Sequence, residues 1–191
     1  MENQIDFYFD LVSPYSYIAS MLIDDVARRG NAKVNWKPFL LGGVFKAVGT
    51  TEAPGLHPAK KPYLLKDLQR LSGHLKIPIK MPPDFPVRTV LAMRTLCGFI
   101  ADEIPQVANT LYKAYWVNNK DIADPDVVAS LVGRDAVEQA GMQEIKDKLF
   151  QSTEEAVRRG AFGAPTFFVK DEMFFGHDRL PLLGLHLSGQ I

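Results

Sequence analysis

A short apolar strand that runs directly into a serine-capped helix is the feature that most constrains the fold of this chain. Aromatic and branched residues at 5–9 predict the strand. Ser13 then offers a side-chain cap, and Pro14 suits the first helical position, where a missing N–H costs nothing. The amide end of this helix favours an anion, and a thiolate is an anion. A second serine, Ser16, follows one turn into the helix.

A helix followed by a β-hairpin is predicted near the C-terminus. Gly160 ends a helical segment, and Pro165 opens an aromatic and β-branched run. A polar turn at 170–172 separates this run from a second one at 173–175. Proline is poorly tolerated inside a central strand but is acceptable as its first residue. An ordinary Gly-Pro turn before a strand is the alternative interpretation, and it requires no ligand.

The two ends of the chain, taken in this order, are typical of thioredoxin-like folds. Thioredoxins carry their two redox cysteines at the places that Ser13 and Ser16 occupy here. In such folds the proline that corresponds to Pro165 is cis, and it exposes the backbone of the preceding residue, Ala164, beside Ser13. A short peptide can pair there as an added strand. The chain would keep a thiolate-stabilising site without a thiol of its own, so the sulfur would have to come from a cofactor.

The chain resembles the 2-hydroxychromene-2-carboxylate isomerases, which belong with the kappa-class glutathione transferases in the DsbA-like branch of the thioredoxin superfamily. The matching segments span almost the whole chain and lie at 9–17, 58–63, 153–156, 159–167 and 175–180. Two positions depart from the family pattern. His177 stands where the kappa-type transferases usually have serine and the isomerases often have glutamine, and Ala164 stands where valine or leucine is common.

The resemblance and the hydrophobic periodicity together imply an α/β, thioredoxin-like fold with a large all-helical insertion. We expect a discontinuous thioredoxin-like domain at 1–57 and 160–191, and a helical insertion domain at 58–159. A second strand is predicted at 33–38, a loop rich in Gly, Thr and Pro at 40–58, and a final helix at 179–189. Further helical segments are predicted around 62–76, 86–101, 105–118, 124–131 and 142–159. Four prolines within 76–86 predict an ordered connector able to line a site entrance.

The resemblance also implies glutathione as the cofactor and assigns residues to it. Ser13 is the expected catalytic residue, which would donate a hydrogen bond to the thiolate, whereas Ser16 is expected to be structural. The other residues expected to bind the cofactor are Lys60, Ala164, Pro165, His177, Asp178 and Arg179. Lys60 would meet the glycine carboxylate, with Lys61 as its substitute. Asp178 would pair with the ammonium, and Arg179 would reach a carboxylate or fix the local helix start. Alternatively, Asp178 is the N-cap of the last helix and needs no ligand.

The implied reaction is a glutathione-dependent cis–trans isomerisation of 2-hydroxychromene-2-carboxylate or a similar intermediate of aromatic degradation. It is nucleophilic covalent catalysis by the glutathione thiolate and needs no metal. Aromatic candidates for a planar carboxylate substrate are Tyr15, Tyr17, Phe39, Phe85, Tyr115 and Trp116, most of them expected in the core. Arg88 and Arg94 are candidates for the carboxylate. A kappa-like transferase and a cofactor-binding module without catalysis remain alternatives, whereas the missing cysteines argue against a thiol–disulfide oxidoreductase.

Composition and charge exclude several other classes of protein. Lys plus Arg equals Asp plus Glu, at 22 each, so electrostatics gives no support for binding nucleic acid. The single cysteine, Cys97, lies in an apolar helical stretch and is expected to be buried and inert. The four histidines show no metal-ligand spacing. With no membrane-length apolar run and no basic flank at the start, we expect a cytoplasmic enzyme, and the resemblance implies a homodimer.

Overall fold

A four-stranded mixed sheet forms the centre of the molecule in the computed structural model, which describes residues 3–50 and 57–191. The strands are β1 (Asn3–Phe9), β2 (Ala32–Pro38), β3 (Thr166–Val169) and β4 (Glu172–Phe175). Their order across the sheet is β2-β1-β3-β4, with β1 and β2 parallel and the other two pairs antiparallel. The two ends of the chain therefore meet in one sheet, as the sequence predicts for a thioredoxin-like fold with a helical insertion.

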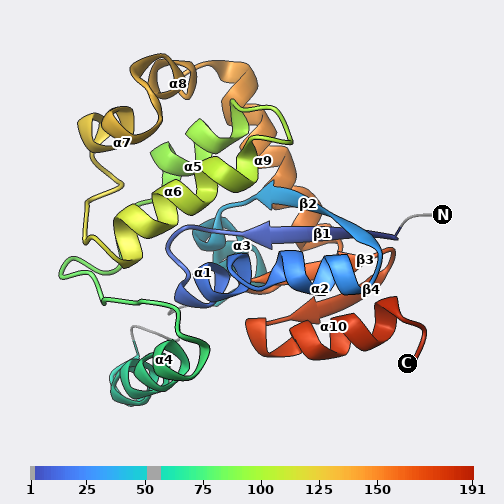
Figure 1. The fold of residues 1–191 in the computed structure, drawn as a ribbon. Helices are drawn as coiled ribbons and strands as arrows, with labels where there is room; N and C mark the ends of the chain where they lie inside the picture. Colours follow the sequence, from blue (N-terminus) through green and yellow to red (C-terminus); the bar gives the residue numbers. More distant parts are fainter. Residues whose placement is uncertain (1–2, 51–56) are drawn as a thin grey trace.

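Helices cover both faces of the sheet (Figure 1). The crossover from β1 to β2 consists of α1 (Pro14–Ser20) and α2 (Ile23–Arg29), and α10 (Leu180–Leu187) packs beside α2. The opposite face is covered by α3 (Leu41–Val48) and α9 (Gln143–Arg158). The remaining helices are α4 (Lys61–Leu75), α5 (Val90–Cys97), α6 (Ile104–Trp116), α7 (Pro125–Val132) and α8 (Arg134–Gln139). Figure 1 shows α5 to α8 on the β2 side of the sheet, with α4 standing apart from them.

Alternation along β1 divides its side chains between two cores. Ile5, Phe7 and Phe9 join the large core that also contains α2, α10, α5 and α6, whereas Tyr8 faces α3 and α9. The Phe7 ring stacks on Phe167 of β3 with centroids 5.1 Å apart. Each of these fully buried side chains contributes about 1.5–3 kcal/mol relative to an exposed one. Because β1 is buried on both faces, the position of its C-terminal end, which leads to Ser13, is tightly fixed.

Four helices differ from the prediction. The predicted loop at 40–58 begins with a helix, α3, and its residues 51–56 lie outside the described part of the chain. α3 contains two glycines, which lower its helix propensity, so the apolar residues that recur at helical spacing along it were not recognised as a helix. The helix predicted from 86 starts only at Val90, and α8 was not predicted. α10 is shorter than the predicted 179–189 and follows a single 3₁₀ turn at His177–Arg179.

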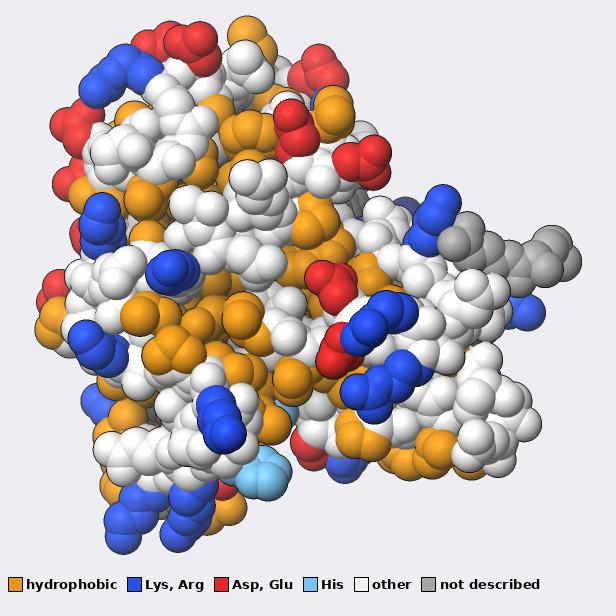
Figure 2. Space-filling view, viewed as in Figure 1, with side chains coloured by type: hydrophobic (Ala, Val, Ile, Leu, Met, Phe, Trp, Pro, Cys, Tyr) orange, Lys and Arg blue, Asp and Glu red, His pale blue; other side chains and the backbone are white. Residues whose placement is uncertain are grey.

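The proline-rich connector between α4 and α5 is irregular, as predicted. Figure 2 shows hydrophobic side chains gathered on the surface where the connector passes between α6 and α4. Lys80 donates its backbone N–H to the Trp116 carbonyl at 2.7 Å, which fastens the connector to the end of α6. Within the described residues, no helix has both the length and the apolar composition needed to cross a bilayer.

Candidate active site

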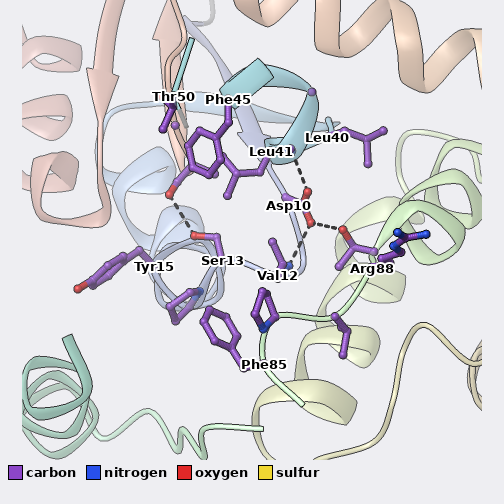
Figure 3. Close-up of a pocket in the computed structure, with 18 of the residues that line it drawn as sticks. Asp10, Val12, Ser13, Tyr15, Leu40, Leu41, Phe45, Thr50, Phe85 and Arg88 are labelled. Carbon is purple, nitrogen blue, oxygen red and sulfur yellow. Dashed lines mark hydrogen bonds between the residues drawn. The ribbon is translucent and has the colours of Figure 1, made fainter. Parts of the chain in front are cut away.

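A cavity of about 900 Å³ opens at the C-terminal end of β1, where α1 begins. Its size falls in the range of small-molecule sites. Segments distant in the sequence supply its walls: 10–15, 40–45, 85–90 and 162–164, together with Thr50, Leu64 and Phe175. Figure 3 shows Val12 and Ser13 between the α3 residues Leu41 and Phe45 on one side and Phe85 on the other. The connector therefore lines this cavity through Phe85 and Pro86, as its proline content suggested.

Ser13 stands at the head of α1 and reaches the far end of the chain. Its hydroxyl accepts the Ser16 backbone N–H at 3.1 Å, which confirms the predicted cap. The same hydroxyl donates to the Ala164 carbonyl at 3.0 Å, and the Ala164–Pro165 peptide bond is cis. The predicted proximity of Ser13 and Ala164 is thus confirmed. The single hydroxyl proton of Ser13 is directed at an acceptor on the cavity wall.

Asp10 joins three of the segments that line the cavity. Its carboxylate is fully buried and accepts the Val12 N–H at 3.1 Å, the Leu41 N–H at 2.9 Å and the Thr89 hydroxyl at 2.7 Å. Burial raises the pKa of Asp10, and the three donors act against that rise. Because Leu41 is the first residue of α3, Asp10 supplies from β1 the cap that the N-cap residue of α3, Leu40, does not provide.

Two side chains of α6 hold the loop between β1 and α1. Trp116 donates its indole N–H to the Leu11 carbonyl at 2.9 Å, and Tyr112 donates its hydroxyl to the Asp10 carbonyl at 3.3 Å. Both side chains are fully buried. The helical segment in the middle of the chain therefore fixes the backbone two and three residues before Ser13, which positions the serine without contacting it.

Tyr15, the second residue of α1, stacks on the ring of His177. Tyr15 and His177 lie parallel, at an interplanar angle of 4° and with centroids 5.0 Å apart. Burial raises the pKa of Tyr15 to about 12, and the charges of Asp67 and Asp178 add to the rise, so the phenol is neutral at pH 7. Burial also lowers the pKa of His177, although the same two carboxylates oppose this shift. Asp67 comes from α4, which sequence reasoning did not connect with this end of the cavity.

The remaining predicted cofactor residues lie outside the cavity lining. Arg179 donates to the Asp178 carboxylate at 2.7 Å, and both side chains are at least half exposed. α10 begins at Leu180 with Arg179 as its N-cap and no side-chain cap, so the interpretation of Asp178 as the cap of this helix is wrong. Lys60 is exposed at the start of α4. The ligand roles of these residues stay predictions.

Only some of the residues predicted to contact the second substrate line the cavity. Tyr15 and Phe85 line the cavity. The other aromatic candidates, Tyr17, Phe39, Tyr115 and Trp116, are buried in the cores. Arg88 lines the cavity and Arg94 does not. Sequence reasoning missed Phe45 of α3, and it missed the Phe162–Phe175 pair, whose ring centroids are 4.5 Å apart. The signal for that pair was available, because one aromatic residue stands just before Ala164 and the other at the end of the hairpin.

Cys97 is not a source of reactive sulfur. Burial raises the pKa of its thiol to about 12, so the thiolate is absent at neutral pH. Its side chain does not line the cavity. Among the residues that the structure describes, no three His, Cys, Asp or Glu side chains gather as metal ligands would. Any thiolate that acts beside Ser13 must come from another molecule.

These features define a class: a protein of thioredoxin-like fold that has serines in place of the cysteine pair and a cis-proline facing them. Residues 4–188 match the DSBA-like thioredoxin domain family, and the chain belongs to this family. The family assignment made from the motifs is thereby confirmed.

Named relatives match over nearly the whole chain. Human "Glutathione S-transferase kappa 1" is 31% identical, over 100% of this chain and 92% of the relative. The "2-hydroxychromene-2-carboxylate isomerase" of Pseudomonas sp. (strain C18) is 30% identical, over 97% and 90% respectively. Among solved structures, a 2-hydroxychromene-2-carboxylate isomerase superposes with a TM-score of 0.87 at 26% identity, covering 98% of this chain and 95% of that one. The resemblance stated from the sequence is therefore confirmed.

Proposed function

We propose that this chain is a glutathione-dependent cis–trans isomerase of 2-hydroxychromene-2-carboxylate or a similar aromatic-degradation intermediate. The observation that carries the proposal is the Ser13 hydroxyl, which lies 3.0 Å from the Ala164 carbonyl at the head of a mainly apolar cavity. The full-length similarity to isomerases and to kappa-class transferases supports the same class of chemistry. When bound, glutathione supplies a thiolate that adds to a conjugated carbon of the substrate and leaves after rotation.

The residues around Ser13 fit a peptide that carries a thiol. The Ala164 carbonyl now accepts from Ser13, and it would accept an N–H of the cofactor backbone instead. The Ser13 hydroxyl would then be free to turn and donate to the sulfur. A hydrogen bond to a charged acceptor contributes about 1.5–3 kcal/mol. Lowering a thiol pKa of ~8.5 by about two units requires about 2.7 kcal/mol, so one such bond with some help from the helix end suffices.

The two ends of the cofactor would be held on either side of this contact. The Asp178 carboxylate is more than half exposed, so it could bind the ammonium group of the cofactor in addition to, or in place of, the Arg179 guanidinium. Asp67 adds negative charge near the stacked rings of Tyr15 and His177. Pro165 would pack against the peptide, and Lys60 would meet the glycine carboxylate. A kappa-type transferase, favoured by the human relative, would use the same residues and release a conjugate.

The test is an ultraviolet assay of the interconversion of 2-hydroxychromene-2-carboxylate and 2-hydroxybenzylidenepyruvate, with and without reduced glutathione. The proposal predicts conversion that depends on glutathione. A parallel assay with a neutral halogenated nitrobenzene measures conjugation. Conjugation without isomerisation would replace the isomerase with the transferase. Failure to bind glutathione by calorimetry would overturn both.

A further inference from the structure

The cavity is lined mainly by apolar residues, and one charged side chain among them is still able to meet a ligand. Its walls beyond Ser13 include Leu41 and Phe45 from α3, and Phe85 and Val90 around the start of α5. Within the described residues, the charged side chains that line it are those of Asp10 and Arg88. Asp10 is fully buried and already accepts three hydrogen bonds, so it offers nothing to a ligand.

Arg88, unlike Asp10, is exposed and, in the described part of the chain, is not occupied by hydrogen bonds. It lies in the short segment before α5, it is among the residues that line the cavity, and among residues 3–50 and 57–191 it has no hydrogen bond or ion pair. Figure 3 shows Arg88 on one side of Val12 and Ser13, and Tyr15 on the other. His177 stacks on Tyr15 and the charge of Asp178 acts on the same ring, so these two of the residues proposed for the cofactor lie at the Tyr15 end. The Arg88 guanidinium therefore remains for the second substrate.

We infer that Arg88 binds the carboxylate of the second substrate and thereby selects flat, apolar carboxylates over neutral molecules of the same shape. This inference rests on the proposed function and adds the feature that separates an isomerase substrate from a neutral electrophile. A guanidinium presents a rigid fork of donors that matches both oxygens of a carboxylate. The apolar walls around it would exclude water from one side of the pair, which strengthens the attraction.

The first experiment measures binding alone, without glutathione. Isothermal titration calorimetry compares 2-naphthoate with the neutral 2-naphthamide for the wild-type protein, Arg88→Met and Arg94→Met. We expect the wild-type protein to prefer 2-naphthoate, and Arg88→Met to bind it about tenfold more weakly, as expected for the loss of one charged hydrogen-bonded pair. Binding of 2-naphthamide should not change. Arg94→Met is the matched control, because this arginine lies on α5 but outside the cavity, and it should behave as wild type.

Three results would overturn the assignment: no preference for 2-naphthoate in the wild-type protein, equal loss of both probes in Arg88→Met, or the same loss in Arg94→Met. Arg88→Lys keeps the charge but not the fork, and it should fall between wild type and Arg88→Met. Turnover then separates the two proposals. Absence of glutathione-dependent conversion, with the probe preference intact, sinks only the proposed isomerase. Loss of the probe preference, with conversion intact, sinks only the role of Arg88.

Discussion

At the scale of single residues, the Ser13 hydroxyl has one proton and two alternative acceptors. In the structure it donates to Ala164, and in the proposed complex it would donate to the cofactor sulfur. We therefore expect Ser13→Ala to retain glutathione binding, raise the pKa of the bound thiol by about one to two units and lower turnover about 10- to 100-fold. Thiolate absorbance as a function of pH measures the first effect directly.

Ser16 provides the matched control for that variant. It is fully buried on the same helix, and within the described chain its hydroxyl makes no hydrogen bond of good geometry, although the Tyr112 hydroxyl lies close by. Ser16→Ala therefore removes a buried, poorly satisfied polar group that does not contact the Ala164 carbonyl, and it should leave both the thiol pKa and turnover near wild type. Ser13→Ala also removes a helix cap worth about 1 kcal/mol, so its folding must be checked by denaturation. Unchanged turnover in a folded Ser13→Ala protein would contradict the role of Ser13.

His177 makes stability depend on pH. Burial lowers its pKa in the native state below the ordinary value of about 6.5. Above pH 6.5 the imidazole is neutral in both states and contributes nothing. As the pH falls through 6.5, the unfolded chain takes up the proton first, so stability is lost. We expect the wild-type protein to lose more unfolding free energy between pH 7 and pH 5 than His177→Gln does.

Urea denaturation at the two pH values measures that difference. His74→Gln is the control, because His74 is exposed on α4, and this variant should keep the wild-type pH dependence. A pH dependence that is identical in wild type and His177→Gln would show that the imidazole titrates alike in the folded and unfolded chain. The departure of this position from the serine or glutamine of the family would then have no effect on the pH dependence of stability.

At the scale of elements, α3 depends on a cap that comes from another strand. The Asp10 carboxylate accepts the first N–H of α3 and also holds Val12 and Thr89. In Asp10→Asn the amide keeps one acceptor oxygen and turns an NH₂ group toward a donor. We expect a loss of about 1–3 kcal/mol of unfolding free energy, the cost of leaving a buried donor unsatisfied. Urea denaturation at pH 7 measures it.

Asp84→Asn is the control for this prediction, since Asp84 is an exposed carboxylate in the connector. It should change the unfolding free energy by no more than about 0.5 kcal/mol. If Asp10→Asn falls within the same limit, the carboxylate does not hold the three segments together. Part of the loss should appear as fraying of α3, which amide hydrogen exchange at Val44 and its neighbours can detect.

The elements also show how far sequence reasoning reaches. Local signals located β1, α1 and the β3–β4 hairpin, because alternation, a capping serine and a strand-opening proline act over a few residues. α3 was missed because its glycines lower helix propensity, while the compensating cap comes from Asp10, thirty-one residues away. For the same reason, the sequence indicated Ser13 and Ala164 but not Phe45 or Asp67. Those two reach the site through helices whose packing no local pattern encodes.

At the scale of the whole molecule, the large core runs without interruption from the sheet into the helical segment. It contains Trp36 of β2, which packs against Phe7 and Phe9, and Trp116 of α6, which packs against Tyr115 and Phe85. The Trp116 indole also holds the backbone at Leu11. The fluorescence of Trp36 thus reports on the sheet and that of Trp116 on the helical insertion, although both belong to one core.

A continuous core predicts that the two parts unfold together. In Trp116→Phe the fluorescence comes from the sheet, and in Trp36→Phe it comes from the insertion. Within each variant, we expect the urea midpoint of tryptophan fluorescence to coincide with that of far-ultraviolet circular dichroism. Trp116→Phe should have the lower stability by about 1 kcal/mol for its lost hydrogen bond, and Trp36→Phe is its matched control. If Trp116 fluorescence changes at lower urea than the dichroism, the helical insertion is a separate folding unit, and Ser13 would lose its support before the sheet unfolds.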